Sequence, residues 1–253
     1  MSTPLPLTGK AALVTGGTRG IGLAIARALC AAGADVAVLG RKPDTVDAAV
    51  AALGEGAGRS LGIAANVASA DDRRAALDQT VERFGGLDIL VNNAAANPVF
   101  GPVEDTAPEA FAKIMDVNVA APFELAKLAL PHLRASGRGA VLNISSIGGL
   151  RPEPKLGIYS VSKTALNGLT RVLAKEWGRY GIRVNAICPG LIQTDFSEAL
   201  WSNDKLVAHF TAMTPLGRVG TPDDVAQLAL ALLSDAGAYV TGQIVTADGG
   251  YTV

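Results

Sequence analysis

The chain has 253 residues, of which 49% are hydrophobic and 18% are charged, and its formal net charge at pH 7 is −1. This composition is typical of a globular protein with an ample core, and the small net charge gives no overall attraction for nucleic acid or an anionic membrane. The first nine residues lack the basic and apolar regions of a signal peptide, and no apolar run reaches membrane-spanning length, so we expect a cytoplasmic protein.

Short apolar runs alternate with longer helical patterns along the whole chain. Strands are predicted at 11–15, 35–39, 61–65, 89–92, 140–145, 183–187 and 243–246. Helices are predicted at 20–32, 43–53, 71–84, 108–135, 158–180 and 222–234, the last capped by Thr221 with Pro222 at its first position. This alternation indicates an α/β protein whose parallel sheet is covered by helices on both faces. Because no linker rich in Pro, Gly or Ser divides the chain, we expect one domain over residues 1–253.

The segment 194–215 interrupts this alternation. Its apolar residues are Phe196, Leu200, Trp201, Leu206, Phe210 and Met213. Two interpretations are equally open: a mobile lid over a site, or a helical hairpin that completes the core or makes a subunit contact.

The cysteines and histidines indicate no special chemistry. Cys30 and Cys188 form no disulfide framework and lack metal-like spacing, so we expect buried core thiols. His132 and His209 have no cysteine or carboxylate cluster at ligand spacing, and we therefore expect no metal site.

A glycine-rich turn follows the first predicted strand and opens the first helix, as Thr15-Gly16-Gly17-Thr18-Arg19-Gly20-Ile21-Gly22. Glycines allow the backbone to approach a pyrophosphate, and the helix N-terminus offers free N–H groups and positive potential. The position between a strand and a helix favours a dinucleotide site over a turn that binds nothing.

The second predicted strand ends without the acidic residue that usually binds the ribose of NAD. It is followed by Arg41 and Lys42, and the first acid is Asp44. Arg41 could grip a 2′-phosphate, with Lys42 or Arg19 adding charge, or these could be solvated surface cations. The missing acid favours NADP(H) over NAD(H).

Tyr159 and Lys163 are four residues apart in a predicted helix, so their side chains share one face. Forming a phenolate at neutral pH costs on the order of 4 kcal/mol, and a nearby ammonium lowers that cost. The pair could therefore make tyrosine a working proton donor and acceptor.

Taken together, these motifs resemble the short-chain dehydrogenase/reductase family in its single-domain form, nearly from end to end. Asn92-Asn93-Ala94-Ala95 is similar to its Asn-Asn-Ala-Gly element, with Ala95 in place of glycine. Pro189-Gly190 with Thr194 resembles the segment that closes over the nicotinamide, and Asp248-Gly249-Gly250 the C-terminal element. Asn66-Val67 stands where many members carry Asp-Val beside the adenine.

The resemblance implies a Rossmann-type doubly wound parallel sheet and a catalytic tetrad of Asn118, Ser146, Tyr159 and Lys163. Ser146 lies thirteen residues before Tyr159, as in relatives, which selects it over Ser145. The implied cofactor-binding residues are Gly16, Thr18, Arg19, Gly20, Ile21, Gly22, Arg41, Lys42, Asn66, Val67, Asn93, Ala94, Tyr159, Lys163, Pro189, Gly190, Ile192 and Thr194.

The implied reaction is hydride transfer from NADPH to a carbonyl, or its reverse from an alcohol. Tyr159 would be the general acid or base, Ser146 would donate to the carbonyl oxygen, and Lys163 would lower the phenol pKa and hold the nicotinamide ribose. Asn118 would hold a water linking Lys163 to solvent; otherwise its side chain simply caps or kinks the helix.

The substrate is less constrained than the reaction. The expected pocket wall comprises 97–100, 150–156, 191–192 and 194–215, and it is mostly apolar, which suits a ketone or a 3-oxoacyl thioester. Arg151 and Lys155 could instead meet an acidic group or be solvated. A non-catalytic NADP(H)-binding sensor is the alternative from another class, although a sensor needs no proton donor. Relatives commonly form homotetramers, and we expect the same here.

Overall fold

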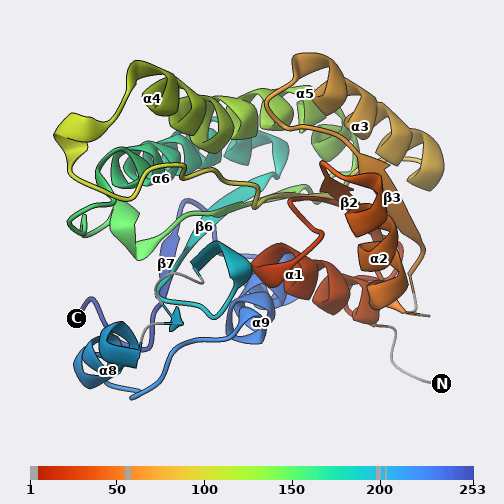
Figure 1. Ribbon diagram of the computed structural model, residues 1–253. Coiled ribbons are helices and arrows are strands. Elements are labelled where there is room, and N and C mark those ends of the chain that lie inside the picture. The colour runs from red at the N-terminus through yellow and green to blue at the C-terminus, as the bar shows by residue number, and fades with distance from the viewer. Residues whose placement is uncertain (1–4, 55–57, 198–200, 203) are drawn as a thin grey trace.

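A computed structural model describes residues 5–54, 58–197, 201–202 and 204–253. Its centre is a parallel seven-stranded sheet in the order β3-β2-β1-β4-β5-β6-β7, with helices on both faces (Figure 1). The strands are β1 (Ala11–Thr15), β2 (Asp35–Gly40), β3 (Ser60–Ala64), β4 (Ile89–Asn92), β5 (Ala140–Ile144), β6 (Arg183–Pro189) and β7 (Ile244–Ala247). The α/β doubly wound fold expected from the sequence is confirmed.

The helices form two layers. The α-helices are α1 (Gly20–Ala31), α2 (Pro43–Leu53), α3 (Ala70–Phe84), α4 (Pro108–Met115), α5 (Ala121–Ala135), α6 (Gly157–Trp177), α8 (Asp204–Met213) and α9 (Pro222–Leu233). Figure 1 shows α1, α2 and α9 below the sheet, and α3, α4, α5 and α6 above it.

Alternation along the strands explains the two layers. In β1, Ala12 and Val14 belong to the core cluster beneath α1 and α9, whereas Leu13 between them belongs to the cluster beneath α3, α5 and α6. Successive strand side chains point to opposite faces, so a strand covered on both sides is apolar at nearly every position. All five residues of β1 are buried accordingly.

The predicted helix over 108–135 is divided in the structure. A π-helical turn, η2 (Asp116–Ala120), joins α4 to α5. Such turns arise where a specific contact distorts the helix, often at a functional site. Here Asn118 supplies that contact, because its buried side chain is bonded to the chain that follows β4.

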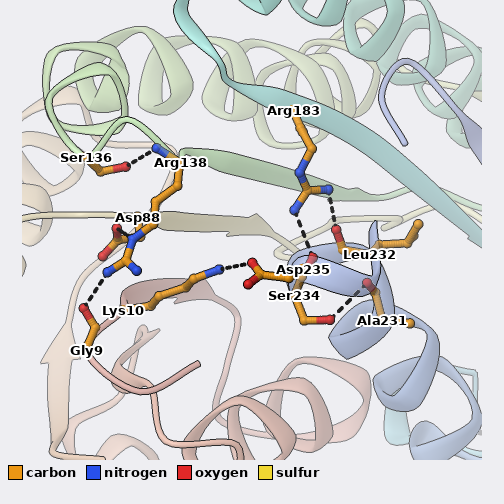
Figure 2. Close-up of polar contacts among 10 residues, drawn as sticks. All are labelled: Gly9, Lys10, Asp88, Ser136, Arg138, Arg183, Ala231, Leu232, Ser234 and Asp235. Atoms are coloured by element: carbon orange, nitrogen blue, oxygen red, sulfur yellow. Dashed lines mark hydrogen bonds and ion pairs between the residues drawn. The ribbon is translucent and has the colours of Figure 1, made fainter. Parts of the chain in front are cut away.

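The amino ends of the strands are tied together by polar side chains (Figure 2). The Asp88 carboxylate accepts from the N–H of Ala11 at 2.8 Å and from Arg138 Nε at 3.2 Å. Lys10 Nζ lies 3.3 Å from Asp235, and Arg183 donates to carbonyls at the end of α9. These contacts join segments far apart in sequence at the edge opposite the glycine-rich turn.

Candidate active site

The loop after β1 has the shape of a cradle. Gly16 and Gly20 adopt φ values of +61° and +53°, which favour glycine. The Asn93 side chain after β4 donates to the carbonyls of Thr15 (3.0 Å) and Gly16 (2.9 Å), joining the ends of two adjacent strands. A Cβ on Gly22 would stand 2.3 Å from the Gly16 carbonyl oxygen, so only glycine allows this approach.

Helix α1 begins in this cradle with its N-terminus uncovered. Arg19 is the N-cap residue and makes no side-chain cap, and the first turn contains no acidic residue. The first N–H groups of a helix have no intrahelical partners and carry positive potential. The predicted residues Gly16, Thr18, Arg19, Gly20, Ile21 and Gly22 are therefore brought together in a geometry that suits a pyrophosphate.

The adenosine end of the predicted site is basic. Strand β2 ends at Gly40, and the next residues, Arg41 and Lys42, are exposed. A Cβ on Gly40 would lie 2.4 Å from Thr18 Cγ2, so the loop packs directly on the strand end. Asn66 and Val67 follow β3, the neighbouring strand, so the predicted nucleotide residues lie at adjacent carboxyl ends.

The segment after β6 closes one side of the cradle. Thr194 Cγ2 would be 3.2 Å from a Cβ on Gly20, and Arg19 forms an exposed ion pair with Asp195 at 3.3 Å. Gly190 donates its N–H to the Ala247 carbonyl at 3.0 Å. The Ile192 side chain is buried in the core cluster beneath α1 and α9, and the expected contact of Ile192 with the cofactor stays a prediction.

Tyr159 and Lys163 meet on α6, as their spacing predicts. The Lys163 ammonium lies 5.6 Å from the centroid of the Tyr159 ring and donates to the Ile144 carbonyl at 2.8 Å. Lys163 is buried, whereas Tyr159 keeps some contact with solvent.

The pKa of Tyr159 does not follow the expected direction. Burial raises it to about 12, and a hydrogen bond with Ser146 opposes that rise. Burial also lowers the pKa of Lys163 to about 8. Desolvation outweighs the Ser146 hydrogen bond, so the pKa of the phenol lies above its ordinary value.

The two neighbouring serines have different surroundings. Ser145 is buried, and its hydroxyl donates to the Lys163 carbonyl at 3.2 Å. Ser146 caps the 3₁₀ helix η3 (Ile147–Gly149), where its hydroxyl accepts the Gly148 N–H at 3.0 Å and also reaches the Tyr159 phenol. The geometry favours Ser146, as the family spacing does.

Asn118 is bonded to protein groups on all sides. Its Oδ1 accepts the Ala96 N–H at 2.8 Å, while Nδ2 donates to the Ala96 carbonyl and to Ser162 Oγ, each at 3.0 Å. Ser162 Oγ in turn donates to the Tyr159 carbonyl at 2.6 Å. This structural role matches the kinked-helix alternative, and it links the π-turn to the helix that carries Tyr159 and Lys163.

Two residues beside Tyr159 received no individual role in the sequence analysis. Phe196 lies in the 3₁₀ helix η5 (Asp195–Ser197). Its ring centroid is 6.2 Å from that of Tyr159, and the two ring planes are inclined by 41°. Ser162 was missed although it directly precedes Lys163, because its partner Asn118 is 44 residues away on another helical element and no local pattern links the two. Leu200, within the expected lid, lies outside the described residues.

A cavity adjoins Tyr159 on the side of the 97–106 loop. Its lining includes Asn97, Val99 and Lys155, together with residues at the start of α6. Lys155 adopts a φ of +70°, and its ammonium lies 5.9 Å from the Phe100 ring centroid. Part of the predicted pocket wall is thus beside Tyr159. The 194–215 segment also lies beside Tyr159 through Phe196. Phe210 of α8 instead stacks on Tyr251, with the two ring centroids 4.2 Å apart.

Two further findings concern the described ranges. None of the helices there has the length and apolarity needed to cross a membrane. Within those same ranges, no three His, Cys, Asp or Glu residues are grouped so that they could hold a metal ion.

Comparisons with known proteins agree with this geometry. A family model described as enoyl-(acyl carrier protein) reductase matches residues 16–252. Dehydrogenase/reductase SDR family member 4 from Sus scrofa is 45% identical over 246 residues, covering 97% of this chain and 88% of the relative. The corresponding protein from Homo sapiens is 44% identical, with the same coverage.

Solved structures extend the similarity to the fold. A short-chain type dehydrogenase/reductase from Mycobacterium ulcerans has a TM-score of 0.92 and 36% identity, covering 98% of this chain and 91% of that one. A candidate NAD(P)-dependent gluconate 5-dehydrogenase from Beutenbergia cavernae, with NADP bound at low occupancy, has a TM-score of 0.90 and 34% identity, covering 98% and 99%. The chain therefore belongs to the short-chain dehydrogenase/reductase family of nicotinamide-dependent oxidoreductases.

Proposed function

We propose that this oxidoreductase is an NADP(H)-dependent carbonyl reductase, which can also run in reverse as an alcohol dehydrogenase. The observation that carries the proposal is the position of Tyr159, whose phenol interacts with Ser146 and whose ring lies next to the buried Lys163 ammonium. These groups follow the carboxyl end of β5, next to β4 and the cofactor cradle. Ligands bind at the carboxyl ends of strands in folds of this kind, where the strand order reverses.

The reduced nicotinamide, when bound, supplies the hydride. Tyr159 gives its proton to the carbonyl oxygen, and a pKa of about 12 keeps that proton in place at neutral pH. Ser146 donates a hydrogen bond to the same oxygen as negative charge develops there. Lys163, fixed by its bond to the Ile144 carbonyl, supplies positive charge beside the phenol ring and would hold the ribose of the cofactor.

A 3-oxoacyl thioester is the second candidate substrate class. The description of the matching family model names an acyl carrier protein substrate, although an enoyl reductase reduces a carbon–carbon double bond and not a carbonyl. Val99, Leu156 and Ile158 supply apolar contacts beside Tyr159, among polar lining residues such as Asn97 and Lys155. A non-catalytic sensor is less well supported, because a sensor gives no reason to keep Ser146 and Tyr159 together.

Removing the phenolic hydroxyl tests the proposed reaction. Tyr159→Phe keeps the ring and should lower ketone reduction by at least about 10²-fold, while NADPH binding changes little. Turnover is followed by the near-ultraviolet absorbance of NADPH across a panel of ketones and acyl thioesters, and binding by fluorescence titration. Tyr180→Phe, in the 3₁₀ helix η4 (Gly178–Tyr180) that follows α6, is the control. Unchanged reductase activity in Tyr159→Phe would refute the assigned role.

Charge at the end of β2 supports the preference for NADP(H). Gly40, Arg41 and Lys42 stand where an acid would be needed to bind an NAD ribose, and the relative from Beutenbergia cavernae holds NADP. Arg41→Asp should raise the KM for NADPH by about 10–100-fold and improve the use of NADH. Steady-state kinetics with both cofactors measure this, with Arg27→Asp on α1 as the control. A wild-type preference for NADH would contradict the assignment.

The homotetramer expected from the resemblance stays a prediction. Exposed apolar side chains on α4, α5 and α6 support it, namely Phe111, Phe123, Val161 and Val172. The cytoplasmic location likewise stays a prediction.

A further inference from the structure

We propose that Arg73 is a positioning residue that holds the turn at Asn66 and Val67 in the conformation that receives the adenine ring. The inference rests on the proposed NADP(H) function. It concerns a residue of α3 that would act through the backbone of Val67.

Arg73 is an unusual residue in the first turns of α3. Only 8% of its surface is exposed, although its charge favours water. Nη1 donates to the Val67 carbonyl at 2.6 Å, while Nε is buried without a hydrogen-bond partner in the structure. Across the described ranges, Arg73 forms no ion pair. A buried guanidinium is therefore used for a single backbone carbonyl.

In the turn that it contacts, the backbone N–H groups on either side of Val67 are engaged. The Asn66 N–H donates to Asp72 at 2.7 Å, the Ala68 N–H to Asn66 Oδ1 at 3.2 Å, and the Ser69 N–H to the Asn66 carbonyl at 2.9 Å. With Arg73 on the Val67 carbonyl, both peptide groups that flank Val67 are fixed.

The Val67 N–H is the exception. It makes no hydrogen bond to any residue that the structure describes. Val67 follows β3, and a small cavity of about 10 Å³ separates it from Thr15, Asn92 and Ala94 at the ends of β1 and β4 and from the η2 and α5 region above them. The Val67 N–H thus belongs to the strand ends where the predicted nucleotide residues gather, and such a donor suits an acceptor nitrogen of adenine.

Stability alone does not explain Arg73. Burying a charge without an opposite charge is unfavourable, and an orphaned donor adds to that cost. The neighbouring inward positions of α3, Ala76 and Leu77, are apolar and buried. An apolar residue at position 73 would suit the core equally well, whereas only a long donor can hold the Val67 carbonyl.

The experiment compares two adjacent arginines. Arg73→Met keeps an unbranched side chain of about the length of the arginine's aliphatic stem and removes the guanidinium donors, and exposed Arg74→Met is the control. We expect the Kd of adenosine 2′,5′-bisphosphate, measured by calorimetry, to rise by about tenfold in Arg73→Met and to be unchanged in Arg74→Met. The KM for NADPH should rise in parallel, while kcat at saturating NADPH stays within about twofold. Arg73→Lys, which keeps a donor, should recover part of the affinity.

Two results would overturn the inference: unchanged nucleotide affinity in Arg73→Met, or equal losses in kcat and affinity, which indicate a general structural role. If Arg73→Met does not fold, the same comparison is made with Arg73→Lys, where weakened nucleotide binding with an unchanged kcat supports the proposal and a reduced kcat contradicts it. A wild-type protein that binds the nucleotide but reduces no ketone would contradict the proposed function and leave the role of Arg73 standing.

Discussion

At the scale of single residues, the site depends on two adjacent serines whose hydroxyls face different partners. Ser145 and Ser146 are adjacent, but the first ties β5 to the backbone of α6 and the second turns toward the Tyr159 phenol. The change occurs where the strand ends and η3 begins, with Ser146 in an extended conformation as its N-cap. One hydroxyl therefore supports the helix, and the other can meet a substrate oxygen.

This difference predicts opposite effects of two equivalent substitutions. Ser146→Ala should lower kcat by about 10²–10³-fold, as the loss of one donor to a developing oxyanion does, with little change in NADPH affinity. Ser145→Ala should leave kcat nearly unchanged and lower the free energy of unfolding by about 1 kcal/mol. Steady-state kinetics and urea unfolding of both variants separate the two roles. A larger kcat loss in Ser145→Ala would reverse the assignment.

At the scale of elements, the helical region from 108 to 135 shows where sequence patterns stop being informative. Apolar spacing predicted one helix, because the pattern continues through the break. The π-turn at 116–120 follows from contacts between Asn118 and Ala96, 22 residues apart, and no local rule reports such a contact. In α9, by contrast, the signal was local: Thr221 and Pro222 predicted the start of the helix, and it begins there.

The start of α9 has a pH-dependent contact. The Arg218 guanidinium donates to both oxygens of Asp224, each at 2.7 Å, and Thr221 donates its N–H to the same carboxylate. The Arg218 bonds, followed by those of Thr221, hold the pKa of Asp224 well below its usual range. A depressed folded-state pKa stabilises the protein above the unfolded value, and this stabilisation is lost as pH falls toward the folded value.

Asp224→Asn should therefore lower Tm at pH 7 by roughly 2–4 °C, the loss expected for a helix cap. The difference between wild type and variant should shrink below about pH 4, where the unfolded carboxyl is protonated. Thermal unfolding by circular dichroism across this pH range measures it, with Asp223→Asn as the control. A Tm difference that is constant from pH 7 to pH 3 would rule out the carboxylate charge as its cause.

At the scale of the whole molecule, the two ends of the strands have different roles. Polar contacts join the chain at the amino ends, and the candidate active site lies at the carboxyl ends. Strand alternation and the glycine-rich turn were sufficient to predict the parallel sheet. Helical spacing predicted that Tyr159 and Lys163 share one face of α6, whereas Asn118 and Ser146 were proposed from the family resemblance. Arg73 and Asp88 were not predicted, since their partners are set by tertiary contacts rather than by local pattern. The polar network at the amino ends in Figure 2 likewise joins segments up to 225 positions apart, as in the Lys10–Asp235 pair.

Asp88 tests whether the amino ends of the strands serve stability and not catalysis. Its carboxylate is buried and accepts from the Ala11 N–H at the start of β1, so Asp88→Ala leaves that donor without its partner. An unpaired buried donor costs about 1–3 kcal/mol, which urea unfolding can measure. Because Asp88 precedes β4 whereas the cofactor loop and Ser146 follow the opposite strand ends, kcat and the KM for NADPH of the folded variant should stay close to wild type. Asp88→Asn, which keeps one acceptor oxygen, should lose less stability. A marked fall in kcat without a fall in stability would mean that the two ends of the sheet are coupled.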